Sequence, residues 1–312
     1  MAKDDKAQPG LTVCTVNWFS TELIESLFLN LNTKAMFPEK IEYLVIDNTD
    51  GKDASVSCLM EMGLPLKIYQ HNTKGETGSF AHASGLNFAM GILETEFALV
   101  VDPDVYVFKD NWDSFAVEEL NSKGCSAIGT TYPRWQLGKY HNFPNPVFCL
   151  FKTRDYKIFN ADWTPYSRNP LVTFGNFFKR QILRCGIFIS RKRYQKFPAV
   201  RKPWTFLERL IGVCSHDTGC RIAEHATRNN IRSILFTAVL PDDTVSGNKA
   251  DAFKELAQEF ELYYYQNEPV LTHKYSSCSK VWRTDRGSDT NLWHECVERF
   301  QSEMTNTRRA KN

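Results

Sequence analysis

The chain has 312 residues, 42% hydrophobic and 24% charged, which is the size and composition of an ordinary globular protein with a buried core. Its formal net charge of +2 excludes a strong global bias toward anionic or cationic partners, so only local charge can matter. Nine cysteines, an odd number without a C-x-x-C pair, indicate a reducing compartment rather than a disulfide framework.

The sequence carries no signal for export or membrane insertion. Residues 1–10 are polar, lack the apolar segment of a signal peptide, and are expected to be disordered. No window of 18 apolar residues predicts a membrane span. We therefore expect a cytoplasmic protein, either free or peripheral to a membrane.

The first half of the chain alternates strand-like and helix-like segments. Strand character, either β-branched or continuously apolar, marks residues 11–16, 41–46, 66–69 and 97–101. Between the first two, Leu23, Leu27 and Leu31 recur at helical spacing. Strands that alternate with helices predict an α/β fold with a doubly wound, mostly parallel sheet.

Beyond residue 113 the pattern is less regular. Residues 131–173 are rich in aromatic residues, proline and asparagine without periodicity, which is typical of a binding loop or lid. Because no linker is visible, we expect one domain over residues 11–300, with halves at 11–113 and 114–300. The remaining expected elements are strands at 183–190 and 233–240, helices at 251–265 and 289–304, and a flexible tail at 301–312.

Two carboxylates, Asp102 and Asp104, directly follow the strand predicted at residues 97–101. Pro103 between them cannot donate to a sheet ladder, so the strand should end there. In open α/β sheets, ligands bind beyond the carboxyl ends of the strands. Two carboxylates this close repel each other unless a cation or hydrogen bonds compensate. The triplet is therefore either a divalent-metal site that faces a diphosphate or a solvated turn.

Three segments, in this order, resemble the family-2 glycosyltransferases of the GT-A fold. They are residues 11–20 (LTVCTVNWFS), 43–51 (YLVIDNTDG) and the acidic triplet 102–104. The resemblance covers residues 11–113 well and 183–280 more thinly. It implies a GT-A fold whose first half binds a nucleotide-sugar donor together with Mn²⁺ or Mg²⁺. It also implies an inverting transfer of the sugar to a hydroxyl of a glycan, a lipid-linked molecule or another acceptor.

The same resemblance implies roles for individual side chains. Asp104 would coordinate the metal, and Asp102 would contact the ribose or the metal. Asp47 would hydrogen-bond the base or ribose of the donor, and Asn17 would line the same crevice; the alternative for each is a turn residue. His273 matches a late histidine that several such enzymes use as a metal or diphosphate contact; the alternative is a structural histidine.

An inverting transfer also needs a carboxylate that removes the proton of the acceptor hydroxyl. Asp217 and Arg221 keep the spacing of the family's acid and arginine, which implies that Asp217 is the catalytic base and that Arg221 contacts the donor. His216 is a departure, because a first acid often stands at that position. The alternative is that Asp217 caps a helix and Arg221 lies on the surface.

The segment between Arg168 and Arg209 is rich in lysine, arginine and aromatic residues and contains a single acid, Glu208. Such a segment either binds an anionic acceptor (a lipid-linked diphosphate, a phosphorylated glycan or DNA) or is a solvated basic face. In the irregular segment 131–173, Arg134, Trp135 and Trp163 are candidates for stacking on a sugar ring.

Two other functions stay open: a non-catalytic nucleotide-sugar- or glycan-binding protein of the same fold, and a glycosyltransferase that acts on hydroxylated DNA bases. An NAD-dependent enzyme is disfavoured, because no G-x-G-x-x-G follows the first strand.

Overall fold

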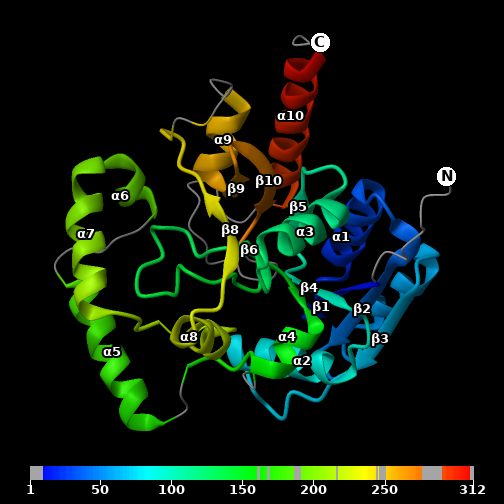
Figure 1. Ribbon diagram of the computed structural model, residues 1–312, viewed down its shortest axis with the longest axis horizontal. Coiled ribbons are helices and arrows are strands. Elements are labelled where there is room, and N and C mark those ends of the chain that lie inside the picture. The colour runs from blue at the N-terminus through cyan, green and yellow to red at the C-terminus, as the bar shows by residue number, and fades with distance from the viewer. Residues whose placement is uncertain are drawn as a thin grey trace.

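The computed structural model describes residues 10–159, 162–166, 169–185, 191–215, 217–243, 245, 251–275 and 290–309. Within these ranges, ten strands form one mixed sheet in the order β3-β2-β1-β4-β7-β6-β8-β9-β10-β5. Helices cover both faces of the sheet (Figure 1).

Four parallel strands build the N-terminal half of the sheet: β1 (Leu11–Asn17), β2 (Ile41–Asp47), β3 (Leu66–Gln70) and β4 (Phe97–Val101). On one face pack α1 (Thr21–Lys34) and α3 (Trp112–Lys123), and on the other α2 (Ser79–Ile92) and α8 (Cys220–Arg228). Because both faces are covered, β4 is apolar throughout, with Leu99 facing one cluster and Val100 the other. The predicted α/β fold with a mostly parallel core is confirmed. Two 3₁₀ helices, η1 (Pro38–Lys40) and η2 (Ala54–Met62), lie in the connections.

Six further strands complete the mixed sheet. They comprise β7 (Phe148–Lys152) between β4 and β6 (Ala127–Thr130), then β8 (Ser233–Ala238), β9 (Glu261–Tyr265), β10 (Glu268–His273) and β5 (Val105–Val107). Strand β8 is parallel to β6, whereas β9, β10 and β5 continue antiparallel. In the β10–β5 pair, His273 lies opposite Val105, so a residue late in the chain reaches the acidic triplet.

Several predicted elements differ in the structure. Residues 131–173, expected to be irregular, contain β7 and α4 (Thr153–Phe159), because the apolar run in β7 finds two antiparallel partners. The helix expected at 251–265 ends as α9 (Asp251–Glu259), and the aromatic residues after it form β9, where such side chains pack well. Of the strand expected at 183–190, residues 183–184 end helix α5 (Pro170–Arg184) and residues 186–190 lie outside the described ranges.

The C-terminal helix α10 (Thr290–Arg309) begins close to the predicted position and packs against α9. Residues 301–309, expected to be a flexible tail, continue this helix, and Tyr106 Oη donates to Gln301 Oε1 at 2.7 Å. The expectation of disorder for residues 1–9 falls on residues that the structure does not describe.

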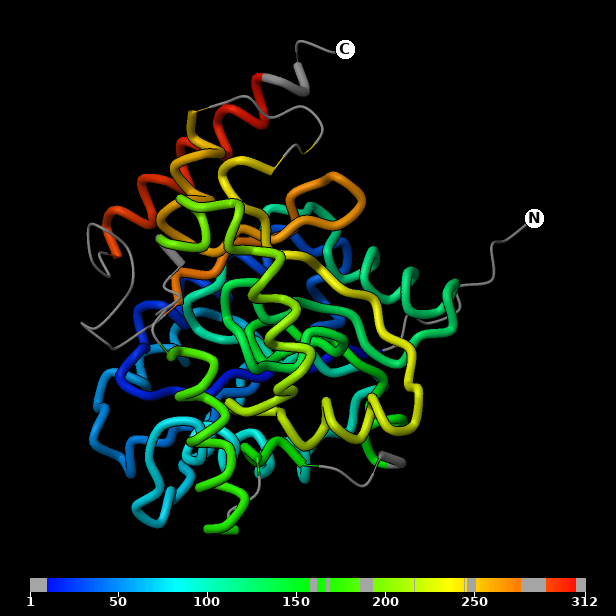
Figure 2. The backbone as a smooth tube through the Cα atoms, turned by 90° about the vertical axis from the view of Figure 1, so that its left-hand side faces the viewer, coloured from blue at the N-terminus to red at the C-terminus, as the bar shows by residue number. Residues whose placement is uncertain are grey.

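Three helices form an arm beside the sheet: α5 (Pro170–Arg184), α6 (Arg191–Lys196) and α7 (Pro198–Ile211). Helix α7 contacts both α5 and α6. Figure 1 shows the arm on the left, across the molecule from β3, and in Figure 2 this side faces the viewer.

Among the helices that the structure describes, none combines the length and the apolar character needed to cross a membrane.

Candidate active site

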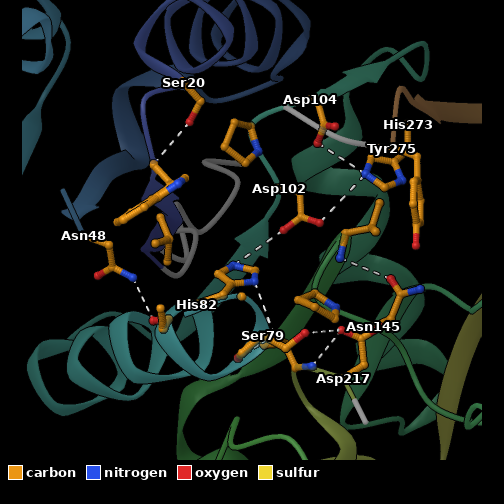
Figure 3. A pocket seen from close by; sticks show the side chains of 18 of the residues that line it. Ser20, Asn48, Ser79, His82, Asp102, Asp104, Asn145, Asp217, His273 and Tyr275 are labelled. Carbon is orange, nitrogen blue, oxygen red and sulfur yellow. Dashed lines mark hydrogen bonds and ion pairs between the residues drawn. The ribbon is translucent and has the colours of Figure 1, made fainter. Parts of the chain in front are cut away.

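A pocket of about 480 Å³ opens beyond the carboxyl ends of β1 and β4. Its wall combines the N-terminus of α2, the loop after β4 and the end of β10, as Figure 3 shows. The predicted acids Asp102, Asp104 and Asp217 and the predicted His273 all line it. Asp102 and His273, which are 171 positions apart in sequence, thus converge where an open α/β sheet binds its ligands.

Asp102, Asp104 and His273 form a cluster suited to a divalent cation. One ligand atom from each lies within 4.8 Å of the others. Nε2 of His273 is 3.3 Å from Asp104 Oδ1 and 3.9 Å from Asp102 Oδ2. Two carboxylate oxygens and an imidazole nitrogen are a common donor set for metals, so the residues fit the predicted metal.

Glu261 orients the imidazole of His273. Its Oε2 is 2.9 Å from His273 Nδ1, which leaves Nε2 directed at the two aspartates. Gln136 Nε2 and Tyr263 Oη donate to the same carboxylate. A carboxylate behind a histidine is the usual outer partner of a metal-binding imidazole.

Electrostatics in this cluster favour charge on the histidine. Burial alone would lower the pKa of His273, but Asp104 and Glu261 outweigh it and raise the pKa well above the ordinary value. For Asp102, burial raises the carboxyl pKa; His82 and His273 oppose that rise, and Asp104 adds to it. A cation bound here would replace the proton of His273 as the compensating charge.

His82 links the acidic cluster to Asp217. Nε2 of His82 is 3.6 Å from Asp102 Oδ1, and Nδ1 is 3.4 Å from Thr218 Oγ1 (Figure 3). Thr218 Oγ1 also donates to the backbone carbonyl of Ser79 at 3.1 Å, so α2 and the segment before α8 are joined at the pocket wall. The structure thus places His82, on the first turn of α2, in the lining of the pocket.

Asp217 is held as a carboxylate. It forms an ion pair with Lys139 and accepts hydrogen bonds from Ser79 Oγ at 3.0 Å and Thr218 N at 2.9 Å. Burial would raise its pKa, but Lys139 and these hydrogen bonds lower it below the ordinary value. Sequence reasoning missed Lys139, because a lysine in a loop without periodicity gives no signal of its partner.

The other predicted donor contacts lie away from the pocket surface. Asn17 and Asp47 are fully buried, and Asn17 Nδ2 donates to Asp47 Oδ1 at 3.1 Å. Arg221 is half-exposed and pairs with Asp162 at 2.9 Å, outside the residues that line the pocket. His216 lies outside the described residues.

The tryptophans expected to stack on a sugar are buried. Trp135 is 5% exposed and Trp163 is 1% exposed, so both are part of the core. Trp18, which follows β1, lines the pocket instead and is 47% exposed. Its position directly after a strand end, beside Asn17, was the signal that could have identified it.

No protein-family model matches the sequence, and no curated protein matches it. Among solved structures, the chain is similar to the mannosyltransferase PcManGT from Pyrobaculum calidifontis in complex with GDP-Man and Mn²⁺, at 20% identity and a TM-score of 0.40 over 51% of this chain and 49% of that one. It is also similar to S. aureus TarS, at 22% identity and a TM-score of 0.38 over 49% of this chain and 30% of that one. The likeness thus spans about half of this chain and half or less of each of the other two proteins, and the function has to be inferred from this chain's own residues.

Proposed function

We propose that the protein is a metal-dependent, inverting glycosyltransferase that moves a sugar from a nucleotide-sugar donor to a hydroxyl acceptor. The observation that carries this proposal is the cluster of Asp102, Asp104 and His273, whose ligand atoms lie within 4.8 Å of one another on the wall of a 480 Å³ pocket. The pocket has the size of a small-molecule site.

In this proposal Asp104, Asp102 and His273 hold the cation. A bound Mn²⁺ or Mg²⁺ would stabilise the negative charge that develops on the departing nucleoside diphosphate. The carboxylates suit either ion, and the imidazole favours Mn²⁺, because Mg²⁺ prefers oxygen ligands and retains water. His82, 3.6 Å from Asp102, stands where it can contact a diphosphate oxygen.

We assign Asp217 as the base. Its lowered pKa keeps it ionised at neutral pH, so it can accept the proton of the acceptor hydroxyl. That oxygen would form a bond to the anomeric carbon as the bond from this carbon to the phosphate oxygen breaks. The ion pair with Lys139 holds the carboxylate in place and would have to loosen as the proton arrives.

A second cavity of about 490 Å³ offers a place for the acceptor. Tyr132 lines both cavities, and Lys139 and Arg209 line the second. These side chains suit an acceptor with an anionic group, such as a phosphorylated or lipid-linked glycan. In this proposal Asn17 and Asp47 support the pocket wall. Arg221 would contact the donor only if its ion pair with Asp162 opened.

The test is donor turnover with and without metal. Purified protein is incubated with a panel of nucleotide sugars and Mn²⁺, and the released nucleoside diphosphate is measured. Asp104→Asn should lower turnover by about 100-fold or more, because the metal loses a charged ligand. Asp110→Asn, which removes an exposed carboxylate six positions later, is the matched control and should behave as wild type. Turnover that survives Asp104→Asn, or that persists with chelator, would contradict the metal assignment.

A non-catalytic nucleotide-sugar-binding protein is the second candidate. The Lys139–Asp217 ion pair favours it, because a carboxylate that stays paired is a weak base. Calorimetry separates the two: donor binding that depends on Mn²⁺, together with no release of nucleoside diphosphate for any donor and acceptor, would establish this alternative.

A further inference from the structure

The helical arm, defined as α5, α6 and α7, presents large apolar side chains to solvent. In α5, the exposed residues Leu171, Phe174, Phe178 and Ile182 are three or four positions apart, which places them on one stripe. Their exposed fractions are 80%, 62%, 50% and 56%. Leu183 is buried on the opposite side of the helix, so this stripe is not the side that packs on the protein.

Helix α7 repeats the arrangement. Phe206 is 71% exposed and Leu210 is 74% exposed, and their spacing of four places them on one side of the helix. Trp204 is 4% exposed and packs inward. Because α5 and α7 contact each other, both apolar stripes belong to one structural unit on the side of the molecule that faces the viewer in Figure 2.

The arm is also strongly basic. Lys179 on α5, and Lys202 and Arg209 on α7, are exposed at helical positions beside the apolar stripes. The single acid of the arm, Glu208, is turned inward, where it accepts from Gly138 N and lies 3.1 Å from His141 Nε2. The exposed charge around the apolar side chains is therefore positive.

We propose that the arm docks on the surface of an anionic lipid bilayer. Helices that combine Phe and Leu on one side with Lys and Arg beside them lie in the headgroup region, where the apolar groups enter the acyl boundary and the cations contact anionic headgroups. A nucleic acid would use the cations but not bury the apolar stripes. This inference does not depend on the proposed enzymatic activity.

The experiment is co-sedimentation of the full chain with two kinds of vesicle, one of phosphatidylcholine and one of phosphatidylcholine with phosphatidylglycerol. Wild type should sediment with the anionic vesicles, and the bound fraction should fall as salt rises. Phe206→Ser/Leu210→Ser should weaken binding by about tenfold or more, because it removes apolar groups that enter the acyl boundary. Separately, Lys179→Glu/Lys202→Glu should weaken it by about tenfold or more, because it reverses two charges that contact the anionic headgroups.

The matched controls alter exposed side chains of the same kinds outside the arm. Leu29→Ser/Met60→Ser replaces apolar residues that are 49% and 58% exposed, and Lys52→Glu/Lys157→Glu reverses two exposed charges. Both controls should bind as wild type, and thermal unfolding should confirm that every variant folds.

Three results would overturn the proposal. The first is equal retention on neutral and anionic vesicles, or retention that survives both arm variants. The second is salt-sensitive binding to duplex DNA that only the charge variant abolishes, without vesicle binding, which would make the arm a nucleic-acid surface. The third is a wild-type dimer that Phe206→Ser/Leu210→Ser converts to a monomer, again without vesicle binding, which would make it a self-association face.

Discussion

Binding of Mn²⁺ should release a proton from His273, so its affinity should rise with pH. The metal-free histidine has a pKa well above the ordinary value, because Asp104 and Glu261 outweigh the effect of burial. A metal needs the neutral imidazole, and below the raised pKa the proton competes with it. Loss of one proton corresponds to a change in affinity of up to about tenfold per pH unit, or about 1.4 kcal/mol.

The same proton contributes to the stability of the metal-free fold. Because the folded-state pKa of His273 is raised, its contribution is fully present below the unfolded-state pKa and is lost as pH rises through the folded-state pKa. The metal-free protein should therefore lose stability over that interval, and Mn²⁺ should restore it, by about 2.7 kcal/mol at a concentration 100 times the Kd.

Calorimetry at pH 6, 7 and 8, in pairs of buffers with different ionisation enthalpies, measures both the affinity and the released proton. His273→Gln keeps the two aspartates but removes this titration, so its affinity should be lower and should depend less on pH. An affinity for Mn²⁺ that is constant from pH 6 to 8 in the wild type, with no proton released, would refute the reasoning.

The remaining predictions concern Asp217 and the sheet. Lys139→Met should raise the pKa of Asp217, which an NMR titration measures. It should also destabilise the fold by about 1–3 kcal/mol in urea unfolding, because both partners of the ion pair are partly shielded from water. Gly129→Ala should destabilise by about 3 kcal/mol or more, because the added Cβ would stand 1.8 Å from the carbonyl oxygen of Phe148. In α2, a Cβ added at Gly91 would have no atom within 4 Å, so Gly91→Ala should raise the free energy of unfolding by about 0.5–1 kcal/mol. Denaturant unfolding measures both alanine variants, and equal effects of the two would refute the argument.

The amino-acid sequence determined the parallel half of the protein. The apolar runs that become β1, β2 and β4 are read from local composition, because strands covered on both faces must be apolar on both. The position of Asp102 and Asp104 followed from the same local rule, since a proline ends the strand and the carboxyl end of a parallel strand faces the ligand.

Tertiary structure decided the rest of the site, because those contacts join residues far apart in the chain. His273 meets Asp104 only through the antiparallel β10–β5 pair, and Asp217 meets Lys139 across 78 positions. Neither pairing leaves a periodic trace in the sequence. The aromatic run of β9 was mistaken for the end of a helix, because its strand form depends on hydrogen bonds to the neighbouring β10 and to β8, more than 20 positions earlier, and not on its own composition.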